Sequence, residues 1–147
     1  MLAIDTSTIS NDLANVVCRV ESDGDLGADF CDRLTRSLAQ LFDLAAAACS
    51  DEDRASFDRI LIRVAPAATE DARLFLSDRL ADAAAPPRGI LIALANDDVT
   101  VARPILRRSP ALGEDDLVEI ARARGPGHMG AIAARPDLTY RITDVLV

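Results

Sequence analysis

Hydrophobic residues recur through most of this sequence at the three- and four-residue spacing of an amphipathic helix. Ser10 is a suitable N-cap for the first predicted helix, whose apolar face consists of Leu13, Val16, Val17 and Val20. The residues that favour a break after it are Asp23, Gly24 and Gly27. The next and longest helix is predicted over residues 28–48, with an apolar face formed by Phe30, Leu34, Leu38, Leu41, Phe42 and Ala45.

Two further helices begin at polar capping residues. Ser50, with Asp53 three residues later, resembles a capping box and opens a helix that Pro66 ends. The inward residues of this helix are Phe57, Ile60, Leu61 and Val64. Thr69 caps the following helix, whose inward residues are Phe75, Leu76, Leu80 and Ala83.

Prolines divide the rest of the chain. Pro86 and Pro87 end one helix and begin another, which Asn96 is expected to end in the left-handed conformation. A helix that starts at Thr100 must hold Pro104 near its first turn or bend there. Further helices are predicted over the ranges 114–124, 128–134 and 139–147. No segment alternates like a strand, so we predict an all-α fold of about eight to nine helices.

Residues 69–147 show an internal repeat. An offset of 30 residues aligns Ala72-Arg73 with Ala102-Arg103, Leu76 with Leu106, and Ile90-Leu91 with Ile120-Ala121. Offsets of 26 and then 25 residues align Arg108–Leu112 with Ala134–Leu138, and Leu117 with Ile142. Helix pairs that repeat in this way bury their apolar faces on their neighbours, which is typical of an α-solenoid.

One ordered set of segments carries a family resemblance: Leu91–Asp97, Val101–Leu106, Ser109–Leu112, Asp115–Ala121, His128, Ile132–Arg135 and Leu146–Val147. On these segments the chain resembles a bacterial domain family of unknown function with HEAT-like, or leucine-rich-variant, helical repeats. The resemblance spans residues 50–147 and implies a short α-solenoid of HEAT-like helix pairs, but no reaction. We therefore divide the chain into an N-terminal helical cap or dimerisation element (1–49) and a repeat region (50–147), packed together as one domain.

Composition and charge narrow the possible partners. Few residues are aromatic, so the core is expected to consist of Ala, Leu, Ile and Val. The net charge is -8, and it is unevenly distributed along the chain. Residues 1–99 carry 18 acidic residues and 9 arginines, whereas residues 100–147 carry 6 acidic residues and 7 arginines. An acidic first part disfavours nucleic acid and anionic membranes, so only the C-terminal part is suited to an acidic partner.

The cysteines and the hydropathy pattern indicate a cytoplasmic protein. Cys18, Cys31 and Cys49 are odd in number and lack Cys-x-x-Cys spacing, so we interpret them as reduced, small core residues. Residues 1–7 lack the basic and apolar regions of a signal peptide, and the longest apolar run, Ile90–Ala95, is too short to span a membrane.

The segment Gly125-Pro-Gly-His-Met-Gly130 matches the dinucleotide-binding pattern Gly-x-Gly-x-x-Gly. That chemistry requires the glycines to follow a strand, whereas here they follow a predicted helix and only 17 residues remain after Gly130. We interpret the glycines as a helix C-cap and an inter-repeat turn, and we predict no cofactor.

The sequence contains a single histidine, His128. Its ordinary pKa near neutrality would suit a phosphoacceptor or an acid–base group, and a phosphorelay protein is therefore one alternative. The spacing offers it no carboxylate or hydroxyl partner, so a capping or surface role is the preferred interpretation.

The acidic clusters are better explained by structure than by chemistry. Residues 51–53 and 114–116 stand at predicted helix starts, where negative charge stabilises the helix dipole. No metal-binding or nucleophile motif occurs, so we predict no metal site, no catalytic residue and no enzymatic activity.

The leading hypothesis is a regulatory adaptor that binds another protein through its repeat helices. The predicted contact residues are exposed arginines and the histidine of the C-terminal repeats, because arginine is enriched in binding hot spots: Arg103, Arg107, Arg108, Arg122, Arg124, His128 and Arg135. Nucleic-acid binding along the same arginines is a second alternative, although Glu114, Asp115, Asp116 and Glu119 interrupt the basic charge. A third is a homodimer formed through Leu13, Val16, Val17 and Val20.

Overall fold

The computed structural model describes residues 15–16, 18–20, 22, 27–45 and 49–147. Over these ranges the regular structure is helical, without a strand, as the sequence predicted. The elements are α2 (Ala28–Ala45), α3 (Asp51–Val64), the short 3-10 helix η2 (Ala65–Ala67), α4 (Glu70–Ala81), α5 (Arg88–Ala95), α6 (Val99–Arg108), α7 (Glu114–Ala123), α8 (Pro126–Ala133) and α9 (Tyr140–Leu146).

The first predicted helix falls largely outside the described residues. Ser10, Leu13 and Val17 are among those not described. Val20 is buried in the core, and Val16 is partly buried against it.

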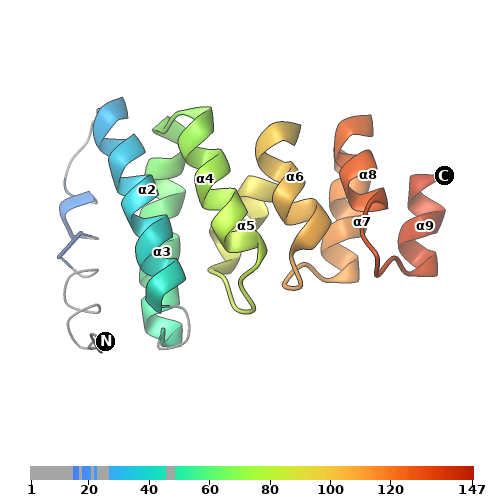
Figure 1. Cartoon of the computed structure of the whole chain (residues 1–147), viewed down its shortest axis with the longest axis horizontal. Coiled ribbons are helices and arrows are strands. Elements are labelled where there is room, and N and C mark those ends of the chain that lie inside the picture. Colours follow the sequence, from blue (N-terminus) through green and yellow to red (C-terminus); the bar gives the residue numbers. More distant parts are fainter. Residues whose placement is uncertain (1–14, 17, 21, 23–26, 46–48) are drawn as a thin grey trace.

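The helices are arranged in two layers along the long axis of the molecule (Figure 1). In the first layer, α2 contacts α4, α4 contacts α6, and α6 contacts α8. In the second layer, α3 contacts α5, and α7 contacts α9. The layers are joined by contacts of α2 with α3, of α5 with α6, and of α7 with α8. Helices that are alternate in sequence are therefore neighbours in space.

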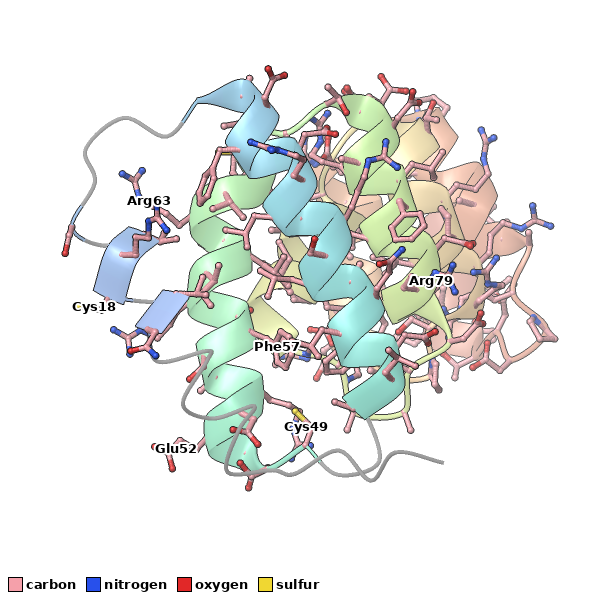
Figure 2. The ribbon with its side chains drawn as sticks, turned by 60° about the vertical axis from the view of Figure 1, so that its left-hand side comes forward. Cys18, Cys49, Glu52, Phe57, Arg63 and Arg79 are labelled. Atoms are coloured by element: carbon pink, nitrogen blue, oxygen red, sulfur yellow. The ribbon has the colours of Figure 1, made fainter. Side chains whose placement is uncertain are left out.

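Small and aliphatic side chains fill the space between the layers, as the composition predicted. Ala39, Ala72 and Ala102 are fully buried, and alanines at such positions let neighbouring helices approach closely. The aromatic contact in the core joins α2 to α3, where Phe42 and Phe57 meet edge to face with ring centroids 5.4 Å apart. Figure 2 shows Phe57 on the side of α3 that faces the other helices.

Polar caps fix several helix starts where the sequence predicted them. Ser50 Oγ accepts a hydrogen bond from the Asp53 amide at 3.1 Å, and the Asp53 carboxylate accepts one from the Ser50 amide at 3.2 Å, which completes the capping box. Thr69 Oγ1 likewise accepts from the Ala72 amide at 3.3 Å. These caps satisfy amide groups that have no partner within their helices.

Two predicted helix ends are wrong. Asn96 has a φ of -101°, so it does not adopt the left-handed conformation, and its amide instead bonds to the carbonyl groups of Ile92 and Ala93. Gly125 does not cap the end of α7 but precedes α8 in an extended conformation. The reason is Pro126, which occupies the first turn of α8 and favours an extended residue before it.

The cysteines differ from the prediction in one case. Cys31 is a buried core residue, as expected, and Cys49 is partly buried, whereas Cys18 is exposed. Among the described residues, no helix combines the length and apolarity needed to cross a lipid bilayer.

Candidate interaction surface

The exposed side of α6 borders a hollow of about 480 Å³ between α6 and the end of α8. Its lining residues are Arg103, Pro104, Arg107, Arg108 and Ala134. The helical period of α6 explains why arginines face this hollow, because its inward positions are taken by buried Val101, Ala102, Ile105 and Leu106. The hollow therefore brings together three of the arginines that the sequence predicted to contact a partner.

Arg108 is held at one side of the hollow by carboxylates of α4. Its Nη2 lies 2.8 Å from Asp78 Oδ1 and 3.2 Å from the Asp78 carbonyl oxygen, and its Nε lies 3.3 Å from Asp82 Oδ1. The hydrogen bond to Asp78 raises the pKa of Arg108 above its ordinary value. Arg108 therefore links α6 to α4 and is fixed in position.

Arg103 and Arg107 differ from Arg108 because neither forms an ion pair or hydrogen bond with the part of the chain that the structure describes. Both are exposed, and they lie one helical turn apart on the same face of α6. Like charges at this spacing repel each other. The pair thus leaves a local positive charge that no described residue pairs with.

The hollow is lined on its other side by a small residue, Ala134, which directly follows α8. Gly130 lies one turn earlier on the same helical face. Gly130 is exposed, and a Cβ atom built there would meet nothing within 4 Å. Gly130 therefore leaves open space on this face of α8, near the hollow.

Arg135 was predicted to be an exposed contact residue, and this prediction is wrong. Its exposed fraction is 6%, because Nη1 donates to the Leu106 carbonyl at 2.9 Å and Nη2 donates to the Ser109 carbonyl at 2.8 Å. Its Nε also donates to Asp137, and this hydrogen bond holds the pKa of the Asp137 carboxyl below its ordinary value. Arg135 satisfies carbonyl groups at the end of α6, so its role is structural.

The remaining predicted arginines lie on or just after α7. Arg122 is exposed and has no partner among the described residues. Arg124 is exposed, and its Nε donates to Asn96 Oδ1 at 3.2 Å. Neither lines the hollow, so the structure does not bring them together with Arg103 and Arg107 there.

His128 is located near the start of α8, with an exposed fraction of 9%. Its Nε2 lies 2.8 Å from the carbonyl oxygen of Asp97, which belongs to the turn between α5 and α6. The Asp97 carboxylate in turn accepts a hydrogen bond from Arg73 Nε at 2.8 Å. In this arrangement His128 joins α8 to the turn between α5 and α6, as a structural histidine would.

The glycine pattern around His128 begins at the N-cap of α8 and continues into the helix. Gly127 and Gly130 both belong to α8, and a Cβ atom at Gly127 would come within 3.1 Å of Val99 Cγ2. Gly127 therefore allows the start of α8 to approach α6 closely. The element before the pattern is α7, so these glycines lack the preceding strand that a dinucleotide site needs.

Two other hollows lie toward the N-terminal side of the molecule. One of about 390 Å³ is mainly apolar and is lined by Ile62, Ala65, Pro66, Arg73, Ile90, Ala93, Leu94 and Asp97. The other, of about 490 Å³, borders α2 and α4 and includes Phe75, which was predicted to be inward but is only partly buried. Arg36 and Arg79 cover the Phe75 ring at 5.7 and 4.9 Å from its centroid, and Figure 2 shows Arg79 on the outside of α4.

Sequence reasoning missed the contribution of α4 to the α6 surface. Asp78 and Asp82 were not among the predicted residues, yet they neutralise part of the arginine charge. The signal was present, because Asp78 precedes Arg108 by the repeat offset of 30 residues. In this case, the two residues related by the offset lie on the neighbouring helices α4 and α6.

Comparison with known proteins gives one local match. A family model described as an uncharacterised protein conserved in bacteria (DUF2336) matches residues 101–147, from within α6 to the end of the chain. No curated protein and no solved structure matches the chain. The resemblance to an uncharacterised bacterial family is thus confirmed over residues 101–147.

Proposed function

We propose that this chain is a non-catalytic adaptor, in which HEAT-like helix pairs form a short solenoid that binds another protein. The sequential contacts within the first layer and the repeat offsets of 30 and 26 residues support the solenoid. The odd number of cysteines supports a reducing, cytoplasmic setting.

The observation that carries the proposal is the pair of unpartnered arginines beside the α6–α8 hollow. On the same helix, the exposed Arg108 is bonded internally to Asp78 and Asp82. Arg103 and Arg107 make no such contact among the described residues. Arginine beside a concave surface is characteristic of protein-binding hot spots.

The test is affinity capture with the full chain as bait. The charge-reversed bait Arg103→Glu/Arg107→Glu is expected to lose a protein that the unmodified bait captures reproducibly. Arg122→Glu is the matched control, because Arg122 is also exposed and unpartnered but lies outside the hollow. If all three baits capture the protein equally well, the interface does not include Arg103 and Arg107. If none of them captures a protein reproducibly, the adaptor proposal is wrong.

A further inference from the structure

We infer that the α6–α8 hollow binds a side-chain carboxylate presented by an acidic segment of a partner protein. This inference rests on the proposed function and specifies the chemistry of the partner. Its basis is a comparison of α6 with α4, which occupies the equivalent place one repeat earlier.

Arg73 and Arg103 are equivalent under the offset of 30 residues, and each follows a fully buried alanine. The Arg73 side chain is only 17% exposed, because Nε bonds to the Asp97 carboxylate at 2.8 Å and Nη1 bonds to the Ala68 carbonyl at 2.7 Å. Arg103 is exposed and has no acceptor among the described residues. At the first position the chain supplies its own carboxylate, whereas at the second no described residue does, and the position is open to a carboxylate from a partner.

Ser77 and Arg107 form the second equivalent pair. Ser77 is buried between α4 and α6, where its hydroxyl donates to the Val101 carbonyl at 2.5 Å. Its equivalent on α6 is a long charged side chain, which stays exposed at the edge of the hollow. A small side chain closes the space between α4 and α6, and the arginine leaves the space between α6 and α8 open.

Arg108 completes the binding surface with a guanidinium group that is already fixed. Its bonds to Asp78 and Asp82 engage Nε and Nη2. Arginine has five N–H donors in a planar fork that matches a carboxylate. A ligand therefore meets two adaptable guanidinium groups and one that is held in place.

The charge of the site favours one carboxylate over more highly charged ligands. Three guanidinium groups line the hollow, and the two carboxylates of Asp78 and Asp82 beside Arg108 offset most of their charge. A phosphate dianion or a nucleic-acid backbone would be repelled by these carboxylates and by the net charge of -8 on the whole chain. A single carboxylate balances the local charge and relieves the repulsion between Arg103 and Arg107.

The experiment follows the arginine side-chain Nε–H signals of the ¹⁵N-labelled full chain by NMR. The probe is a capped alanine-based peptide with a single glutamate. We expect saturable shifts of the Arg103 and Arg107 signals, with smaller changes at Arg122. The variant Arg103→Gln/Arg107→Gln should weaken binding by at least about tenfold, whereas Arg122→Gln should leave it unchanged.

Three results would overturn the inference. The first is equal binding of a peptide with glutamine in place of glutamate. The second is a shift of Arg122 as large as those of Arg103 and Arg107, which would indicate unspecific charge attraction. The third is clearly tighter binding of a matched phosphoserine peptide or of inorganic phosphate, which would make the hollow a phosphate site.

The capture experiment separates this inference from the proposed function. If Arg103→Glu/Arg107→Glu loses the captured protein but the glutamate peptide does not bind, the adaptor proposal stands and the carboxylate chemistry is wrong. If the variant retains the captured protein, the hollow is not the interface.

Discussion

Arg108 on α6 and Asp78 on α4 form an ion pair, with Nη2 and Oδ1 2.8 Å apart, and they are separated by 30 residues in the sequence. The same number is the offset of the internal repeat. The contact joins α4 and α6, which are neighbouring helices of the first layer. Several expected outcomes follow from contacts of this kind.

Removing the free arginine charges should not weaken the fold. Arg103 and Arg107 repel each other and make no bonds within the described residues, so Arg103→Gln/Arg107→Gln should keep or raise stability by about 0.3 kcal/mol. Thermal denaturation of this variant, beside Arg122→Gln, provides the measurement. A melting temperature lowered by several degrees in the double variant alone would mean that the arginines have a structural role.

Arg135 should behave in the opposite way. Replacing it with leucine leaves the Leu106 and Ser109 carbonyls without their partner, so we expect a loss of about 2–4 kcal/mol in unfolding free energy. Urea denaturation measures this loss, and Arg122→Leu is the control at an exposed arginine. Equal stability of the two variants would contradict the role of Arg135 as a link between α6 and α8.

Two glycines should respond in opposite directions to alanine. At Gly89, a Cβ atom would lie 2.6 Å from Asp58 Oδ2 and 2.7 Å from Ile62 Cδ1, while Asp58 accepts the Gly89 and Ile90 amides at the start of α5. Gly89→Ala should therefore destabilise by about 1–2 kcal/mol through the loss of this cap. Gly130→Ala, in open space within α8, should stabilise by about 0.5–1 kcal/mol. Destabilisation by both changes, measured in urea, would mean that the space around α8 is not free.

The start of α7 should contribute stability that depends on pH. Asp116 accepts from Arg88 Nη2 at 2.7 Å and from the Gly113 amide at 3.0 Å, and the Arg88 bond above all lowers the pKa of Asp116 below its ordinary value. A lowered pKa in the folded state stabilises the fold above the unfolded pKa, and this contribution disappears as the pH falls through the folded value.

We therefore expect Asp116→Asn to be about 1 kcal/mol less stable than the unmodified chain near neutral pH. The difference should vanish in acid. Asp115→Asn is the control, because the Asp115 side chain is 86% exposed and its pairing with Arg141 should contribute little. A difference that persists unchanged in acid would show that the Asp116 charge is not its source.

His128 offers a test of structure against chemistry. If its main role is the Nε2 bond to the Asp97 carbonyl, His128→Gln should preserve most of the stability, because an amide can donate in the same direction. His128→Ala should lose about 1–2 kcal/mol. An acid-labile phosphate that forms on incubation with ATP and a cognate kinase, and is absent from both variants, would instead favour the phosphorelay alternative.

Local features of the fold were predictable from the sequence. The caps at Ser50 and Thr69 depend on hydrogen bonds between residues only three positions apart, so the residue types themselves indicate the geometry. The inward faces of α3 and α6 follow from helical spacing in the same way. The division at residue 49 and the adaptor role stay predictions.

The candidate site was only partly predictable, because it depends on contacts between helices. Helical spacing placed Arg103 and Arg107 on one face, and both line the hollow. It could not indicate that Arg135 turns inward toward carbonyl groups at the end of α6. It also gave no sign that Ala134, directly after α8, lines the same hollow as these arginines.

The junction between α6 and α8 has a consequence for local opening. The contact of α8 with α6 is less extensive than that of α4 with α6, and its polar links include those of His128 and Arg135. Amide hydrogens of α8 should therefore exchange with solvent sooner than those of α4. A ligand that bridges the two sides of the hollow would hold this junction closed. Its binding would therefore slow amide hydrogen exchange in α8, although α8 contributes no arginine to the hollow.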